Sequence, residues 1–132
     1  MGRLPSHVGI ILVDHGSRFG GANALLEEVA RLYQRTFGAA IVEPAHMELA
    51  EPTIAQAFGK CVVRGAREIV VHPYFLSPGR HSSEDIPRST GEAAAQFPGV
   101  PYRLTEALGL DERMAEVIHR RVLEALERGD DT

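Results

Sequence analysis

Four short apolar stretches alternate along this chain with longer segments of helical periodicity, and this order constrains the fold more than any other feature. The apolar stretches predict strands at about residues 8–14, 40–47, 68–75 and 100–105. The other segments predict helices at about residues 23–37, 52–64, 82–97 and 111–126. Alternating strands and helices form a parallel sheet with right-handed crossovers. The expected fold class is therefore α/β, a doubly wound four-stranded sheet with helices on both faces.

Residues at the ends of the helical segments support these bounds. Gly38 is typical of the position just past a helix end, and Pro52 suits a first turn. Ser82 followed by Asp85 predicts a capping box, and Asp111 is expected to cap the last helix. That helix carries an apolar stripe made of Met114, Val117, Ile118, Val122 and Leu126.

Two histidines follow strands that are expected to be neighbours. The simplest doubly wound strand order is 2-1-3-4, and ligands bind at the carboxyl ends of the strands in such sheets. His15 follows the first strand and His81 follows the third, so their loops should face each other. Imidazole binds metals and transfers protons near neutral pH. The pair indicates an enzyme or a metal site.

Other polar residues lie on the same predicted rim. Gly16 lets a ligand approach the backbone closely, and Arg80 beside a helix N-terminus suits a carboxylate or a phosphate. Glu51 fits either the start of a helix or a ligand-facing position, whereas Glu48 is expected to be structural. The remaining histidines are expected to be packed or hydrogen-bonded within strands (His46 and His72) or to lie on the surface (His7 and His119).

Composition excludes several classes of protein. The 132 residues predict a single domain over residues 1–132, and a net charge of −4 argues against nucleic-acid binding. The longest apolar run is far shorter than the roughly 20 residues of a membrane span. No charged-then-apolar leader is seen, so the cytoplasm is the expected location. Cys61 is the one cysteine, which excludes an internal disulfide and an iron–sulfur cluster held by one chain. It is expected to pack on the apolar face of a helix.

Three blocks of sequence carry a family resemblance. They are His15-Gly16-Ser17-Arg18; Met47-Glu48 through Glu51-Pro52-Thr53; and Pro73-Tyr74-Phe75-Leu76 through Gly79-Arg80-His81 with Asp85-Ile86-Pro87. In this order the blocks resemble the small class II tetrapyrrole chelatases, the CbiX-like sirohydrochlorin cobaltochelatases and ferrochelatases. The resemblance extends over most of the chain.

The resemblance implies ATP-independent insertion of Co²⁺ or Fe²⁺ into sirohydrochlorin, in cobalamin or sirohaem biosynthesis. It implies that His15 and His81 bind the incoming metal and that His15 accepts a pyrrole proton. The residues it implies for contact with the macrocycle are Arg18, Glu51, Leu76, Ser77, Pro78, Gly79 and Arg80. The metal is a substrate, and no tightly bound cofactor is expected. Longer chelatases contain two such domains, so the resemblance also implies a homodimer around the tetrapyrrole.

Two other functions stay open at this point. A histidine-phosphatase-type phosphoryl transferase also has a His-Gly pair after its first strand, but that chemistry calls for an arginine where this chain has Asp14. A non-catalytic metal carrier or tetrapyrrole-binding module would use the same two histidines. Turnover with free metal would separate such a carrier from an enzyme. The residues do not distinguish cobalt, iron and nickel.

Overall fold

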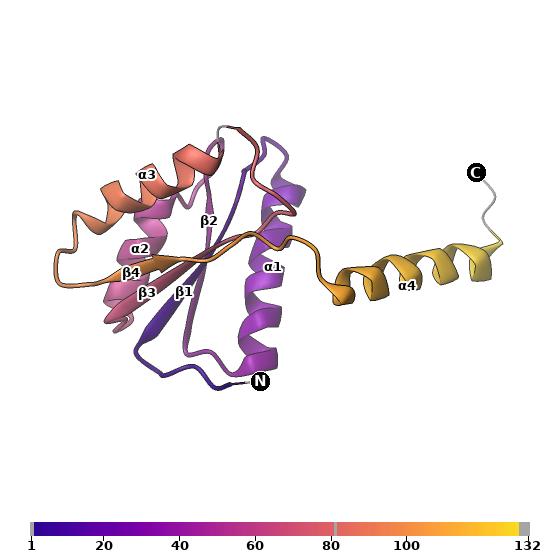
Figure 1. The fold of residues 1–132 in the computed structure, drawn as a ribbon, viewed down its shortest axis with the longest axis horizontal. Coiled ribbons are helices and arrows are strands. Elements are labelled where there is room, and N and C mark those ends of the chain that lie inside the picture. The colour runs from indigo at the N-terminus through magenta and orange to yellow at the C-terminus, as the bar shows by residue number, and fades with distance from the viewer. Residues whose placement is uncertain (1, 81, 130–132) are drawn as a thin grey trace.

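Four strands form one parallel sheet in the order β2-β1-β3-β4, as the sequence predicts (Figure 1). The structure is a computed structural model that describes residues 2–80 and 82–129. The strands are β1 (Val8–Asp14), β2 (Ile41–His46), β3 (Glu68–Pro73) and β4 (Tyr102–Leu104). β1 pairs with both β2 and β3 over most of its length, with Ile11 opposite Glu43 on one side and Val71 on the other. The predicted fold class is confirmed.

Helices cover both faces of the sheet (Figure 1). The covering helices are α1 (Gly20–Phe37), α2 (Ile54–Val63) and α3 (Ser82–Ala94), and a fourth helix, α4 (Glu112–Arg128), follows β4. Successive side chains of a strand point to opposite faces, so β1 contributes to two core clusters. Ile11 and Val13 pack with α2 and α3, whereas Ile10 and Leu12 pack with α1. The helices on the two faces are therefore held by alternate residues of the same strand.

Cys61 packs as the sequence predicts, in the buried face of α2. A side chain at Gly9 of β1 would put its Cβ 3.1 Å from the Cys61 Sγ, so α2 lies close against the central strand. Burial, with a smaller effect from the negative charge of Glu43, raises the pKa of the Cys61 thiol to about 12. The thiol stays protonated at neutral pH and acts as a small apolar group.

Two of the predicted helix ends are confirmed. Gly38 has a left-handed φ of 67° directly after α1, and the Asp111 side chain accepts a hydrogen bond from the backbone of Arg113 at the start of α4. α1 begins at Gly20, three residues before the predicted start, and Phe19 at its N-cap makes no side-chain cap. β3 ends at Pro73 and β4 is only three residues long, so both are shorter than predicted.

Two predicted features of helix N-termini are wrong. Pro52 lies before α2 because Thr53 and Gln56 form a capping box that begins the helix at Ile54. The predicted capping box of Ser82 and Asp85 does not form. Ser82 is itself in α3, and its hydroxyl accepts the Gly79 N–H at 2.8 Å, whereas Asp85 pairs with the Arg88 side chain.

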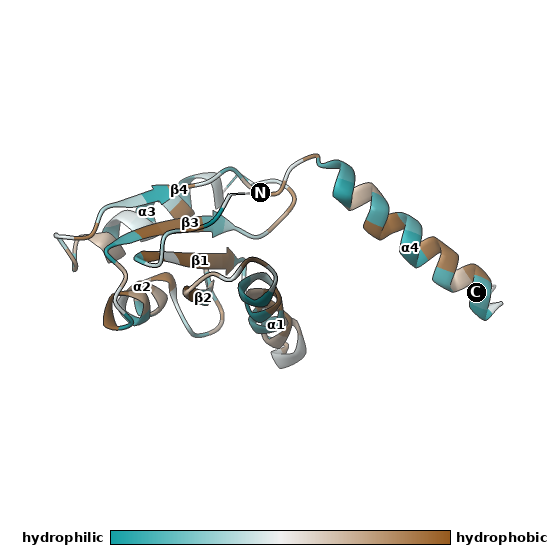
Figure 2. Ribbon diagram, turned by 90° about the horizontal axis from the view of Figure 1, so that it is seen from below, coloured by the Kyte–Doolittle hydropathy of each residue, from teal (hydrophilic) through white to brown (hydrophobic). Residues whose placement is uncertain are grey.

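α4 stands away from the rest of the molecule (Figure 2). Its apolar stripe is present as predicted, yet within the described chain the helix has no buried residue. The alternation of strands and helices predicts that this helix packs on the sheet. In the structure it extends away from the sheet instead. Among residues 2–80 and 82–129, none of the helices has the length and hydropathy that a bilayer span requires.

The free edge of β2 carries a proline. The Val42 carbonyl and the His46 N–H face away from β1, bonded to the Arg31 side chain and to the Pro52 carbonyl. Alternation along the strand puts the nitrogen of Pro44 on the same outer edge. Proline has no N–H, so the free edge lacks a donor at its centre.

Replacing Phe58 with alanine is expected to lower the free energy of unfolding by about 3–5 kcal/mol, because it opens a cavity in the core. Phe58 is fully buried and its ring is stacked on Phe97 with a centroid distance of 5.6 Å. The same substitution at Phe19, which is 79% exposed, should change stability by less than about 0.5 kcal/mol. Urea denaturation measures both; equal losses would contradict this account of the core.

Candidate functional site

The candidate site lies where the carboxyl ends of β1, β2 and β3 meet. The Met47 N–H, just after β2, donates to the Asp14 carbonyl at 2.8 Å. The Tyr74 N–H, just after β3, donates to the Val13 carbonyl at 2.6 Å. The loops that leave these three strands therefore begin side by side on one rim, and the prediction that the first and third strands are neighbours is confirmed.

The carboxylate of Asp14 fixes the turn that carries His15. Its Oδ1 accepts the Gly16 N–H at 3.0 Å and the His46 Nδ1 contacts the same oxygen at 2.6 Å. His46 is only 3% exposed, so its ring anchors the carboxylate from inside the protein. The prediction that His46 is a packed, hydrogen-bonded residue is confirmed.

Gly16 is required by the close approach of a second loop. Its φ is +90°, and a Cβ at this position would lie 1.8 Å from the carbonyl oxygen of Glu48. The backbone N–H of Glu48 also donates to the His15 carbonyl at 3.1 Å. The turn after β1 and the loop after β2 are therefore in direct contact, and no side chain fits between them.

The ring of Phe75 orients the His15 imidazole. The two rings are stacked, with centroids 4.5 Å apart and planes 18° apart. His15 is exposed, whereas Phe75 is half-buried at the start of the loop after β3. The imidazole thus has one face on an apolar support while its edges remain accessible. Phe75 was not among the site residues predicted from the sequence. Its position just after the strand next to β1 could have indicated it.

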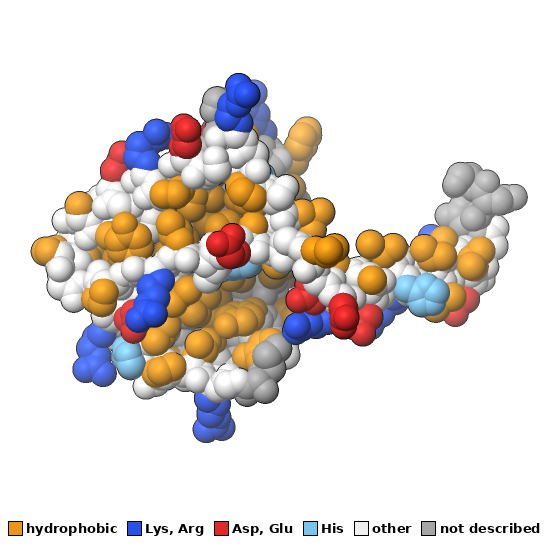
Figure 3. Space-filling view, viewed as in Figure 1, with side chains coloured by type: hydrophobic (Ala, Val, Ile, Leu, Met, Phe, Trp, Pro, Cys, Tyr) orange, Lys and Arg blue, Asp and Glu red, His pale blue; other side chains and the backbone are white. Residues whose placement is uncertain are grey.

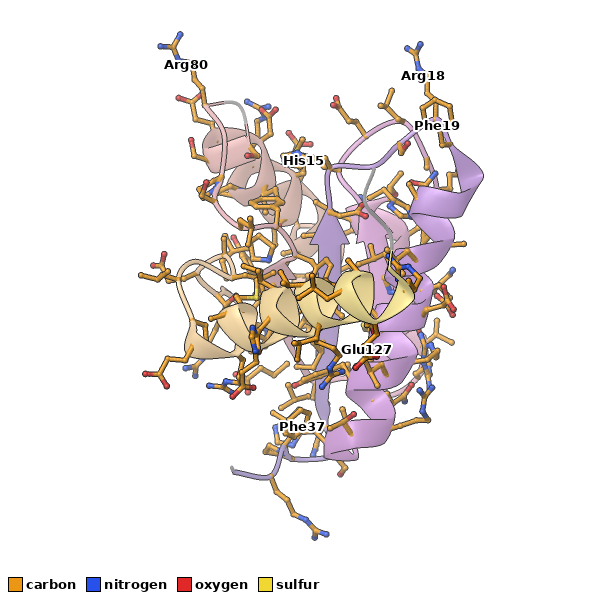
Figure 4. All side chains as sticks on the ribbon, turned by 90° about the vertical axis from the view of Figure 1, so that its right-hand side faces the viewer. His15, Arg18, Phe19, Phe37, Arg80 and Glu127 are labelled. Atoms are coloured by element: carbon orange, nitrogen blue, oxygen red, sulfur yellow. The ribbon has the colours of Figure 1, made fainter. Side chains whose placement is uncertain are left out.

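Two exposed arginines lie on either side of His15 (Figure 4). The Ser17 N–H donates to the Asn23 Oδ1 at 3.0 Å, and the Asn23 side-chain amide donates to the Ser17 carbonyl at 2.7 Å. These two bonds close the loop that carries Arg18 and Phe19. Arg80 comes from the loop after β3. Within the described residues, neither guanidinium forms an ion pair with a carboxylate. Phe19 is an exposed aromatic residue that sequence reasoning missed.

The loop between β3 and α3 is exposed over most of its described part. Its residues are Tyr74, Phe75, Leu76, Ser77, Pro78, Gly79 and Arg80, of which the last five are exposed. The Gly109 N–H donates to the Leu76 carbonyl at 2.8 Å, which ties this loop to the segment that leaves β4. His81 lies outside the described residues, so its expected position opposite His15 stays a prediction.

The two glutamates of the loop after β2 have different surroundings. Glu48 is exposed, and its backbone is held in the His15 turn by the bond described above. Glu51 lies three residues before α2 and accepts a hydrogen bond from the Gln56 side chain at 2.9 Å. Glu48 is therefore bonded directly to the His15 turn, whereas Glu51 is not. The sequence had favoured Glu51 over Glu48 as the ligand-facing residue. The backbone bond between Glu48 and His15 joins two loops that are distant in sequence, so no local sequence pattern predicts it.

The rim offers metal donors of two kinds. The His15 imidazole and the Glu48 carboxylate are exposed, whereas the Asp14 carboxylate is occupied by its own bonds. Over residues 2–80 and 82–129, no group of three or more His, Cys, Asp or Glu side chains is arranged to hold a metal ion. His15 and Glu48 are therefore exposed candidates for a metal ligand among the described rim residues.

His72 is separate from this site, as predicted. It lies in β3, and its Nδ1 contacts the Thr105 hydroxyl at 2.7 Å. Burial lowers the pKa of the His72 imidazole below its usual value of 6.5, and a bond to the Glu106 backbone opposes the shift. His72 is therefore a neutral structural residue near physiological pH.

Comparison with known proteins shows that the chain belongs to the CbiX family. Residues 9–125 match the CbiX family model. A protein named sirohydrochlorin ferrochelatase, chloroplastic, from Arabidopsis thaliana is 48% identical over 118 residues, which are 89% of this chain and 52% of that protein. A sirohydrochlorin cobaltochelatase from Methanopyrus kandleri is 31% identical, over 90% of this chain and 97% of the relative.

The fold also matches that of a solved chelatase structure. The crystal structure of the sirohydrochlorin chelatase SirB from Bacillus subtilis subspecies spizizenii, in complex with cobalt, has a TM-score of 0.81 and 30% identity. The match covers 89% of this chain and 50% of that chain. The chain thus spans about half the length of the plant and Bacillus relatives and nearly all of the archaeal one.

Replacing Gly16 with alanine is expected to lower the free energy of unfolding by at least about 1–2 kcal/mol, since a left-handed φ alone costs that much. The collision with the Glu48 carbonyl adds to this loss. The matched control is Gly20→Ala in α1, where an added Cβ meets nothing within 4 Å. Chemical denaturation gives both values. A Gly16→Ala protein as stable as the control would show that the two loops separate freely.

Protonation of His72 is expected to make stability fall as the pH drops below 6.5. A lowered pKa in the folded state means that the unfolded chain binds more protons, so stability rises with pH in this range. The urea midpoint of His72→Gln should therefore fall less between about pH 7.5 and pH 5 than that of the unsubstituted protein. His119→Gln, at an exposed position of α4, is the control. An unchanged slope in His72→Gln would rule His72 out as the cause.

Proposed function

Because the chain belongs to the CbiX family, we propose that it inserts a divalent metal ion, Co²⁺ or Fe²⁺, into sirohydrochlorin without ATP. The observation that carries the proposal is the exposed His15 imidazole, supported by Phe75 and fixed through Asp14 at a rim where three strands end. Insertion of M²⁺ displaces two pyrrole N–H protons. The site must therefore bind the metal and accept protons, and neutral imidazole can do both.

His15 and His81 are proposed as the protein ligands of the incoming metal, with His15 also accepting a pyrrole proton. Glu48 is proposed as a further oxygen donor because its backbone is bonded to the His15 turn. Two or three donors suit a chelatase, since the ion must be released to the macrocycle. A closed four-ligand site would retain it.

The remaining rim residues are proposed to contact the macrocycle. The acidic side chains of sirohydrochlorin suit Arg18 and Arg80, which are exposed and flank His15 (Figure 4). Phe19 offers an apolar ring beside Arg18, and its side chain is 79% exposed. The other proposed contacts are Glu51, Leu76, Ser77, Pro78 and Gly79.

A homodimer is proposed as the working form. A tetrapyrrole is a broad disc, and binding sites bury most of the surface of a ligand. One rim covers one face of the disc, and a second copy related by two-fold symmetry covers the other with the same residues. We also propose the cytoplasm as the location and cobalamin or sirohaem biosynthesis as the pathway.

Replacing His15 with alanine should slow metal insertion about 100-fold or more, because a ligand and proton acceptor is lost. The assay follows the absorbance of sirohydrochlorin with Co²⁺, Fe²⁺ and Ni²⁺ in turn, and His81→Ala should behave alike. His7→Ala is the matched control, since His7 precedes the opposite end of β1. Thermal midpoints of the three variants should stay close together, because rim loops contribute little to the core.

Two outcomes would contradict the proposal in different ways. Full insertion rates in both His15→Ala and His81→Ala would show that the histidines are not the metal site. Stoichiometric metal binding without turnover in the unsubstituted protein would indicate a metal or tetrapyrrole carrier instead of an enzyme.

A further inference from the structure

Leu49, in the loop after β2, has a left-handed backbone conformation. Its φ is +70°, and among residues 2–80 and 82–129 it is the one residue other than glycine with a positive φ. This conformation brings the Cβ of an L-residue close to the following carbonyl oxygen and costs free energy, so glycine or asparagine is the usual residue. Leucine is therefore an unfavourable residue for this backbone.

Hydrogen bonds on both sides hold Leu49 in this conformation. The His46 N–H donates to the Pro52 carbonyl at 2.8 Å and closes the loop that contains Leu49. The Glu48 N–H donates to the His15 carbonyl at 3.1 Å and fixes the backbone directly before it. Strained conformations persist where the surrounding structure imposes them, and they cluster at sites that bind ligands.

The packing of the Leu49 side chain does not account for a leucine at this position. A buried leucine would offset backbone strain through the apolar area that it removes from water. Leu49 is 54% exposed, so it gains only part of that stabilisation. A residue that is both strained and exposed beside His15 indicates a contact with a ligand instead of a contact with the core.

The other two loops at His15 also expose large apolar side chains. Phe19 in the loop after β1 is 79% exposed, and Leu76 in the loop after β3 is 62% exposed. Leu76 directly follows Phe75, whose ring is stacked on His15. At this end of the molecule, at the top of Figure 3, hydrophobic side chains project beside charged ones. Each of the three loops that meet at His15 thus presents an exposed apolar side chain.

We propose that Leu49 contacts the substrate, and that its strained backbone holds the side chain against one face of the tetrapyrrole. This inference rests on the proposed function, and Phe19 and Leu76 are the other two supports. The face of a tetrapyrrole is apolar and its carboxylates lie at the edge, so apolar side chains suit the face and arginines suit the edge. Three contacts are the fewest that fix a plane. Together they set how the macrocycle lies relative to the His15 imidazole.

The first test measures the binding of sirohydrochlorin without metal, by its change in fluorescence on titration with protein. Leu49→Asn keeps a residue that tolerates the left-handed conformation but removes the apolar contact, so it should raise the Kd about tenfold. Leu49→Met keeps an apolar side chain of similar volume and should leave the Kd within about twofold. An unchanged Kd in Leu49→Asn would overturn the inference.

Val63→Asn is the matched control for removing an exposed apolar side chain. Val63 is 87% exposed and is the last residue of α2, which begins on the rim side and ends at the opposite end of the sheet. Its substitution should not change the Kd for sirohydrochlorin. A loss of binding in Val63→Asn equal to that in Leu49→Asn would show that the effect is not local to the rim, and would overturn the inference.

The second test measures stability by urea denaturation. Leu49→Asn and Leu49→Gly relieve the left-handed strain, so the urea midpoint of each should equal or exceed that of the unsubstituted protein. Unchanged or higher stability together with weaker substrate binding is the result expected for a residue kept for its ligand. A leucine that serves only the fold predicts the opposite. A lower midpoint in both variants would therefore overturn the inference.

The tests separate this contact from the proposed metal insertion. An unsubstituted protein that binds sirohydrochlorin through Leu49 but inserts no metal would refute the proposed function and support the contact. Full insertion rates with an unchanged Kd in Leu49→Asn would refute the contact alone. An unsubstituted protein that does not bind sirohydrochlorin would overturn both.

Discussion

β1 is hydrogen-bonded on both sides, and the candidate site depends on this pairing. Its register with β2 and β3 sends alternate side chains into two different cores and brings the ends of three strands to one rim. The pairing continues past the strand ends, where Met47 and Tyr74 bond to the last carbonyls of β1. Beyond the last strand pairing, the Asp14 side chain holds the turn of His15 in place, because it bonds both to buried His46 and to the backbone of that turn. The position of the imidazole is thus set by the hydrogen-bonded centre of the sheet.

The fold was predictable because its strong signals are local and repeated. β1 is apolar at nearly every position, which is typical of a strand covered on both faces. The alternation of four strands with helices then leaves few topologies, and the strand order follows from the simplest crossover pattern. His15 could be selected because it follows such a strand directly. The start of α2 was not predicted, since neighbouring candidate caps such as Thr53 differ by small energies.

Other features of the site and the fold could not be read from the sequence because they arise from contacts between distant segments. The bond between Glu48 and His15 and the stacking of Phe75 on His15 join three separate loops. The orientation of α4 depends on how Leu108 and Gly109 bond to the loop after β3. Periodicity identified the apolar stripe of α4 correctly, but periodicity does not say which surface covers a stripe.

The proline at the free edge of β2 affects the tendency of this chain to aggregate. An unpaired strand edge is a template for further strands, and natural proteins block such edges to avoid aggregation. Pro44 removes a donor at the middle of this edge, and the Arg31 side chain occupies the neighbouring Val42 carbonyl. The opposite edge is β4, which is only three residues long. Both edges of the sheet are therefore poor templates for a further strand, which protects the chain against growth into cross-β aggregates.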